Sequence, residues 1–227
     1  MDDDIHRASN LATNVYPKVF RTDFSQPGFA LINLGPVFGS QRQRHLMVEL
    51  KHELARLDYE HRGRNLVYQS LGRFDQQVTT KPHRDGGPDE SILMLGYEPT
   101  TVESRVSLSD YSKCSFDLGL TPAEFLDCHN PMFPDGQDRL AHYTTELTEF
   151  DHSSFQILIV NNSMTPSGND RLLGVLHTAE IIDPVPEQPR IVNTTMIGCG
   201  KEVNSGVSSN DVADFISTDV IRRAAYR

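Results

Sequence analysis

The feature of this sequence that most restricts its fold is a series of short segments, rich in β-branched residues, that begins at residue 64. Glycine, proline, asparagine and aspartate separate the segments, which is typical of strands joined by turns. About eight such segments follow one another, the strand count of a jelly roll. We therefore predict a mainly β jelly roll with flanking helices and with strands at residues 65–71, 76–83, 91–97, 104–111, 141–150, 155–162, 172–182 and 190–198.

The N-terminal part of the chain, residues 1–63, is expected to support this sheet structure. Its first twenty-odd residues lack strong periodicity and are expected to form an arm. A short apolar strand follows at residues 29–34. Ser40 then has the character of a helix N-cap, and the helix should run to about residue 58, because its leucines form one apolar stripe that needs a sheet to pack against.

The β core is expected to span residues 64–200, with an insertion near residues 111–141. Within the insertion, Thr121 and Glu124 have the spacing of a capping box, which predicts one helix there. Residues 201–227 are expected to form a final amphipathic helix that packs on the core through an apolar face, made by Val212, Phe215, Ile216 and Val220.

Composition restricts the class of partner and the compartment. Lysine and arginine total 21 against 31 acidic residues, and the resulting net charge of −10 makes nucleic acid an unexpected main partner. No apolar run is long enough to span a bilayer, and the acidic N-terminus lacks the hydrophobic region of a secretory signal. The three cysteines form no CxxC pair, and the Cys128-His129 pair has no second pair at zinc-finger spacing. We expect a cytoplasmic protein without membrane association.

The stretch KPHRDGG, residues 81–87, raises the main question about function, because His-Arg-Asp also opens the catalytic loop of protein kinases. The kinase interpretation fails, since that loop needs an asparagine five residues after the aspartate, where Glu90 stands. In a strand, side chains two residues apart point to the same face. His83 and Asp85 can therefore point together into a β-barrel, with Arg84 pointing away, and they make half of a site for a divalent metal.

A second histidine from a distant strand would complete a site of two histidines and one carboxylate, which leaves three positions open on iron. His177 lies in an apolar, strand-like run that could hold a ligand rigidly, and Arg190 follows in the next expected strand. An arginine fixed inside a barrel needs an anion, and its fork matches a carboxylate. His129, followed by Arg139, ranks lower because its surroundings are loop. The remaining histidines considered for this position are His142 and His152.

The order His83-x-Asp85, His177, Arg190 resembles the Fe(II)- and 2-oxoglutarate-dependent oxygenases, over residues 64–198 of this chain. In that family a double-stranded β-helix carries HxD…H on the metal and a basic residue on the distal carboxylate of 2-oxoglutarate. The resemblance implies that His83, Asp85 and His177 hold Fe(II), that Arg190 anchors 2-oxoglutarate, and that Tyr68 reaches this cosubstrate. It also implies that O2 is consumed, that succinate and CO2 are released, and that an unactivated C–H bond is hydroxylated.

The sequence departs from the family pattern after Arg190, where many members have Arg-x-Ser and this chain has Ile191 and Val192. The second anchor of the carboxylate is therefore unidentified. Two alternatives stay open: a cupin-like metal enzyme that does not use 2-oxoglutarate, and a non-catalytic β-barrel that binds a small ligand or a protein. The substrate could be a small molecule or an amino-acid-like side chain, and the sequence does not specify the oligomeric state.

Overall fold

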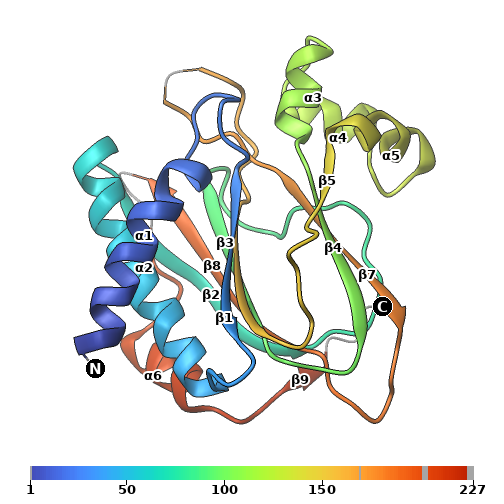
Figure 1. The fold of residues 1–227 in the computed structure, drawn as a ribbon. Helices are drawn as coiled ribbons and strands as arrows, with labels where there is room; N and C mark the ends of the chain where they lie inside the picture. Colours follow the sequence, from blue (N-terminus) through green and yellow to red (C-terminus); the bar gives the residue numbers. More distant parts are fainter. Residues whose placement is uncertain (1, 169, 201–203, 224–227) are drawn as a thin grey trace.

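The computed structural model describes residues 2–168, 170–200 and 204–223. Two β-sheets share one apolar core, and helices lie outside them (Figure 1). The strands are β1 (Phe29–Gly35), β2 (Asn65–Asp75), β3 (Ser91–Tyr97), β4 (Glu103–Ser109), β5 (Thr144–Glu146), β6 (Phe155–Asn161), β7 (Leu176–Asp183), β8 (Ile191–Gly200) and β9 (Arg222–Arg223).

The larger sheet has the antiparallel order β1-β6-β3-β8-β2, and the two-residue β9 joins the edge of β2 in parallel. Its central strands are apolar on both faces, as expected for a sheet that is covered on both sides. On β3, Leu93 and Leu95 face the smaller sheet, whereas Ile92 and Met94 pack in the cluster that includes the helices. The smaller sheet has the order β5-β4-β7 and contributes Val106 to the shared core.

The strand predicted at residues 76–83 does not form, so this prediction is wrong. This stretch runs beside β7, but the two are joined through scattered bonds: the Thr80 N–H donates to the Ala179 carbonyl at 2.9 Å, and the Ile181 N–H donates to the Thr79 hydroxyl at 2.9 Å. Pro82 has no N–H to donate, and threonine hydroxyls replace part of the ladder. Each of the other predicted strand segments contains a strand.

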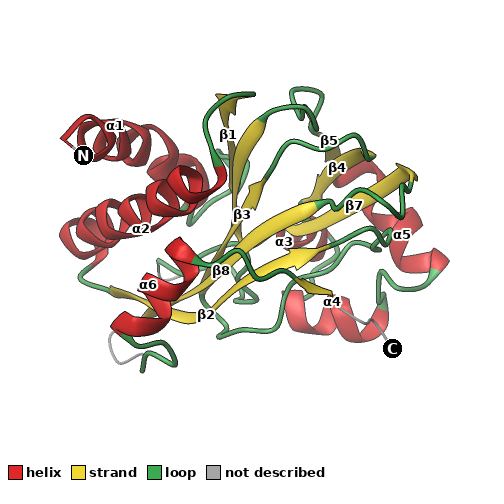
Figure 2. Cartoon of the chain, turned by 90° about the horizontal axis from the view of Figure 1, so that it is seen from below, coloured by secondary structure: helices red, strands yellow, loops and turns green. Residues whose placement is uncertain are grey.

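The helices are α1 (Asp2–Val19), α2 (Ser40–Arg62), α3 (Tyr111–Asp117), α4 (Pro122–Cys128), α5 (Pro134–Leu140) and α6 (Ser209–Ser217), with a 3-10 turn at Ala141–Tyr143. Helices α1, α2 and α6 lie together on the outer face of the larger sheet, and α3, α4 and α5 lie near the smaller sheet (Figure 2). The predicted helix is confirmed and spans Ser40–Arg62, but its N-cap is Gly39 and not Ser40, whose hydroxyl donates to Glu98 instead.

The predicted N-terminal arm is wrong, because these residues form α1. Its buried side is made of small and β-branched residues spaced by three or four positions, Ala8, Ala12, Val15 and Val19. Such a stripe packs closely on a neighbouring helix although its alanines add little hydrophobicity. The predicted C-terminal helix is shorter than expected: it ends at Ser217, and Val220, expected on its apolar face, is 69% exposed.

The insertion contains three short helices where the sequence predicted one. The predicted capping box of α4 is confirmed: the Glu124 N–H donates to the Thr121 hydroxyl, and the Glu124 carboxylate accepts from the Thr121 N–H. Helices α3 and α5 were missed because each spans about two turns, too short to show a clear apolar period.

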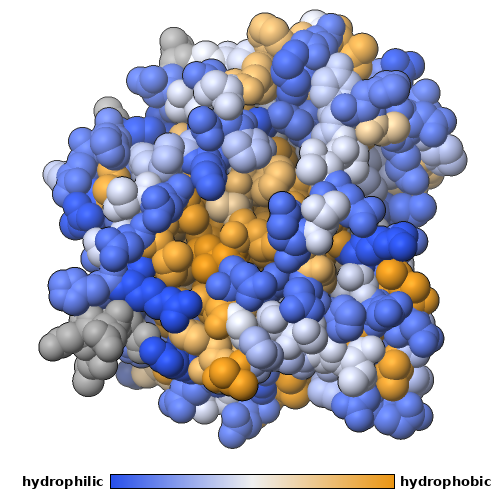
Figure 3. All heavy atoms as spheres, in the orientation of Figure 1, coloured by the Kyte–Doolittle hydropathy of each residue, from blue (hydrophilic) through white to orange (hydrophobic). Residues whose placement is uncertain are grey.

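Over the described residues the fold is therefore mixed, with two antiparallel sheets and six α-helices, and the strands do not close into a barrel. Most strands of the predicted mainly β jelly roll form, but its closure is not seen, because β1 and β5 are open edges of their sheets. Hydrophobic residues gather in a hollow at the centre of the face seen in Figure 3, between hydrophilic rims. No helix within the described residues has the length and apolar character to cross a membrane.

Candidate metal centre

The structure brings His83, Asp85 and His177 together. Each offers one ligand atom, and these atoms lie within 4.8 Å of one another. Asp85 Oδ1 is 3.4 Å from His83 Nε2 and 4.0 Å from His177 Nε2. Among the described residues this is the group of histidine and acidic side chains that could hold a metal ion.

A local backbone pairing brings the two histidines side by side. The His83 N–H donates to the His177 carbonyl at 3.1 Å, and the His177 N–H donates back to His83 at 2.9 Å. Because directly opposed residues of an antiparallel pair project to the same side, the rings stand together, with centroids 4.2 Å apart. The pairing replaces the longer strand that the sequence predicted before His83.

Asp85 is positioned by Asn162, a fully buried residue that directly follows β6. The Asp85 N–H donates to Asn162 Oδ1 at 2.9 Å, and Asn162 Nδ2 donates to the Asp85 carbonyl at 3.0 Å. Arg84, which was expected to point away from the two ligands, donates to the carbonyls of Asn162, Gly87 and Pro88 and so closes the loop. The sequence signal for Asn162 was a polar pair ending the apolar run FQILIVNN.

The protonation tendencies of the two imidazoles differ. Burial, reinforced by the neighbouring charge of His83, lowers the pKa of His177 to about 4, so its ring is neutral at physiological pH, as a metal ligand must be. Burial also disfavours charge on His83, but hydrogen bonds to Asp85 and to the Lys81 carbonyl outweigh it and raise its pKa. His83 Nδ1 lies 2.8 Å from the Lys81 carbonyl, which leaves Nε2 directed toward Asp85.

A cavity of about 360 Å³ opens beside the three residues. Strands from both sheets line it, because Leu93 and Val192 of the larger sheet face Ala179 of the smaller one. The His83 and Asp85 side chains are 29% and 39% exposed, so these two residues lie where the cavity meets solvent, whereas His177 is buried. The remaining wall is mostly apolar, with polar groups from Ser70, Gln76, Thr80, Tyr97 and Thr194.

Arg190 is buried against the wall of this cavity, with 2% of its surface exposed. Nε lies 3.1 Å from Ser104 Oγ, and Nη1 donates to the Gln76 carbonyl at 3.2 Å. Nη2 is buried without a hydrogen-bond partner among the described residues. Burial lowers the Arg190 pKa, which Tyr97 and Asp75 partly offset. A buried cation in this state is suited to bind an anion.

Tyr97 is the neighbour that connects Arg190 to the cavity. The Arg190 guanidinium carbon lies 5.2 Å from the Tyr97 ring centroid, and Tyr97 lines the cavity. Burial raises the pKa of the Tyr97 hydroxyl, so it stays protonated and able to donate. Sequence reasoning missed Tyr97; its position at the end of an apolar strand, with the same parity as Leu93 and Leu95, was the available signal.

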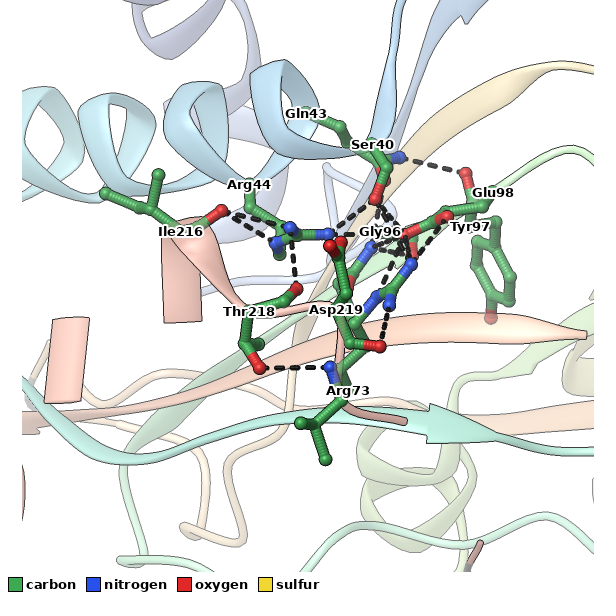
Figure 4. A network of polar contacts seen from close by, with 12 residues as sticks. Ser40, Gln43, Arg44, Arg73, Gly96, Tyr97, Glu98, Ile216, Thr218 and Asp219 are labelled. Carbon is green, nitrogen blue, oxygen red and sulfur yellow. Dashed lines mark hydrogen bonds and ion pairs between the residues drawn. The ribbon is translucent and has the colours of Figure 1, made fainter. Parts of the chain in front are cut away.

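A buried polar network on the helix side of the larger sheet contacts the end of β3 (Figure 4). Gln43 Nε2 donates to the Tyr97 carbonyl at 2.9 Å. The adjacent Glu98 carboxylate accepts from Arg73 at 3.1 Å and lies 3.6 Å from Arg44. Arg44 also donates to the carbonyls of Ile216 and Thr218, and Arg73 to that of Asp219, which fastens the chain after α6 to the larger sheet.

The structure does not bring Tyr68 to the cavity, contrary to the sequence-based assignment. A β-bulge lies between Tyr68 and Ser70, so the alternation of β2 reverses there. Ser70 and Phe74 face the cavity, whereas Tyr68 packs in the helix-side cluster with the ammonium of Lys51 5.1 Å from its ring centroid.

The alternative ligand His129 stands apart from the three residues. His129 Nδ1 lies 2.9 Å from Asp135, and Arg139 pairs with the same carboxylate at 3.3 Å. Neither residue lines the cavity, and neither His142 nor His152 belongs to a group of described residues that could hold a metal. Cys128 is an exposed free thiol without a zinc-like cluster among the described residues.

Fold and site together describe a protein with two antiparallel sheets and a His–Asp–His group that could hold a metal ion. Comparison with models of protein families finds no match, and comparison with curated proteins finds no significant one. Function must therefore be inferred from the geometry of the site.

Proposed function

We propose that this protein is an Fe(II)- and 2-oxoglutarate-dependent dioxygenase that hydroxylates a C–H bond of a small molecule or side chain. His83, Asp85 and His177 supply the two imidazoles and one carboxylate that suit iron with open positions. Bound iron would activate O2 and couple the decarboxylation of 2-oxoglutarate to that hydroxylation. The apolar part of the cavity wall would help a bound substrate to exclude water from the reacting groups. We also propose that the two sheets, which face each other across the cavity, form a double-stranded β-helix.

Arg190 carries the proposal. Its guanidinium is buried, has an unpartnered Nη2 and lies beside a cavity that ends at a candidate iron site. It is therefore suited to bind the distal carboxylate of a dicarboxylate whose other end binds the metal. Tyr97 supplies a hydroxyl next to the guanidinium and takes the role of second anchor that the sequence left open. A cupin-like enzyme that does not use 2-oxoglutarate leaves this buried cation without an anion.

The test is optical and uses anaerobic protein. Fe(II) and 2-oxoglutarate together should produce the visible charge-transfer band of a chelated 2-oxo acid, and Fe(II) with succinate should not, because succinate lacks the oxo group. Iron binding without the band at saturating 2-oxoglutarate would favour the cupin-like alternative. Absence of iron binding would favour a non-catalytic barrel. Under air, release of succinate from 2-oxoglutarate then serves to screen candidate substrates.

A further inference from the structure

Strand β1 leaves one long edge of the larger sheet without a partner. Among the strands that the structure describes, it pairs only with β6, and it lies at the front of the view in Figure 1. The Asn161 N–H donates to the Gly28 carbonyl at 2.8 Å, and hydrogen-bonded pairs recur every second residue in an antiparallel ladder. Ala30 and Ile32 therefore direct their backbone groups toward β6. The backbone groups of Phe29, Leu31 and Asn33 point outward, and within the described chain no backbone hydrogen bond reaches them.

Each of the other sheet edges has a partner or a charge that β1 lacks. Along β7, the Thr80 N–H donates to the Ala179 carbonyl and the His83 backbone pairs with that of His177. On the opposite edge, β9 pairs with the end of β2, and the Gly206 N–H donates to the Tyr68 carbonyl. In the smaller sheet, β5 has only three residues and carries a glutamate. Strand β1, with the sequence FALINLG, has seven residues and neither charge nor proline, the devices that usually prevent edge-to-edge pairing.

The flanks of this edge are apolar on both sides. Phe29, Leu31 and Phe150 are partly buried against the core between the sheets, and Leu34 and Leu11 are partly buried against the helix-side core. Figure 3 shows the hollow of hydrophobic residues in this central region of the face. A strand laid along β1 would therefore place apolar side chains on both of its faces. Strand β1 itself has apolar side chains on both of its faces.

We propose that β1 pairs antiparallel with β1 of a second copy, around a twofold axis at Leu31, so that the two larger sheets become continuous. The outward-pointing residues are symmetric about Leu31. Phe29 then opposes Asn33 of the second copy, and Leu31 opposes its own equivalent. Each of these pairs exchanges two backbone hydrogen bonds, and a self-complementary contact is what twofold symmetry requires. No like charges meet, because the strand has none. This contact does not involve the metal site.

Two substitutions at one exposed position separate backbone pairing from side-chain effects. Asn33→Pro removes an outward N–H that the monomer does not use, and Asn33→Ala keeps it. Both lose the bond that the Gly35 N–H donates to Asn33 Oδ1. Sedimentation equilibrium over a dilution series should show a dimer for the natural sequence and for Asn33→Ala. For Asn33→Pro the dimer should weaken by about tenfold or more, since two hydrogen bonds of the symmetric interface are lost.

Amide hydrogen exchange gives a second readout that needs no substitution. The amides of Ala30 and Ile32 should be protected at every concentration, whereas those of Phe29, Leu31 and Asn33 should become protected only as the dimer forms. A natural chain that stays monomeric throughout the series, with fast exchange at the outward amides, overturns the proposal and leaves the edge to a foreign strand or to none. A dimer that Asn33→Pro does not weaken also overturns it, because the interface then lies elsewhere.

Discussion

At the scale of single residues, substitution of Arg190 best distinguishes the candidate functions. Arg190→Leu should weaken the binding of 2-oxoglutarate by about 2–5 kcal/mol, the range for truncating one partner of a buried charge pair. Iron binding should change little, because Arg190 is not among the three candidate ligands. Titration of the charge-transfer band with 2-oxoglutarate measures the first quantity, and iron per chain the second.

The matched control for Arg190→Leu is Arg139→Leu, since Arg139 is the basic residue that follows the rival ligand His129 in the sequence. Arg139 pairs with Asp135 and is partly exposed, so its loss should leave both measurements unchanged. If Arg139→Leu weakens 2-oxoglutarate binding and Arg190→Leu does not, the anchor has been placed at the wrong arginine. The histidine assignments would then need the same comparison, with His129→Ala set against His177→Ala.

The three cysteines should differ in reactivity. Burial raises the pKa of Cys114 to about 11 and also raises the pKa of Cys199, whereas Cys128 is exposed. Because the thiolate is the nucleophile, a raised pKa leaves the two buried thiols protonated at mildly alkaline pH. A thiol reagent should therefore modify one cysteine per native chain and all three after denaturation. Native Cys128→Ser should react with none; rapid labelling of that variant would show that the core opens around α3 or β8.

At the scale of elements, the bulge in β2 decides which tyrosine faces the cavity. Tyr97→Phe removes a hydroxyl beside Arg190 and should weaken 2-oxoglutarate binding by about 1–2 kcal/mol. Tyr68→Phe should leave that affinity unchanged, because the bulge turns Tyr68 toward the helices. Its buried hydroxyl has no partner, so its removal should not lower the free energy of unfolding. Loss of cosubstrate affinity in Tyr68→Phe alone would mean that β2 lacks this bulge in solution.

The network in Figure 4 joins four elements through one carboxylate. Glu98→Gln would remove the carboxylate that both Arg44 and Arg73 contact while the two guanidinium groups stay buried, which should lower the free energy of unfolding by about 3 kcal/mol. Urea unfolding measures this change. The control is Glu60→Gln, which breaks a solvent-exposed ion pair with Arg56 and should have little effect. Equal effects of the two variants would show that the Glu98 network does not fasten the chain after α6.

The sequence predicted those parts of the fold and the site that depend on residue type and on regular alternation along a strand. It did not predict the parts where that alternation is interrupted or where distant residues meet. His83, Asp85 and His177 could be grouped because residue type and order were enough. Tyr68 could not be placed, since a single bulged residue reverses the face of everything before it and leaves no composition signal. Asn162 was invisible as a positioning residue because its role depends on contacts across 77 positions. Helix α1 was missed because its buried stripe is half alanine.

At the scale of the whole molecule, open edges replace barrel closure, and this has a consequence for association. The larger sheet ends in β1 on one side, where backbone groups and apolar flanks face outward together. An edge of this kind is stable in a dilute monomer only if hydration compensates its unpaired groups, and pairing between copies satisfies them instead. The net charge of −10 on each copy opposes that pairing over a longer range.

The dimer proposed at β1 should therefore become tighter as salt is added. The interface strand has no charge, so salt has no ion pair to screen there and acts mainly on the repulsion between two acidic molecules. Sedimentation equilibrium in a series of sodium chloride concentrations measures the dissociation constant, which should fall as ionic strength rises toward and above the physiological range. Asn33→Pro, run in parallel, should stay largely monomeric, which separates this effect from general salting-out. A dissociation constant that rises with salt would show that ion pairs elsewhere on the surface hold the copies together, and β1 would then not be the interface.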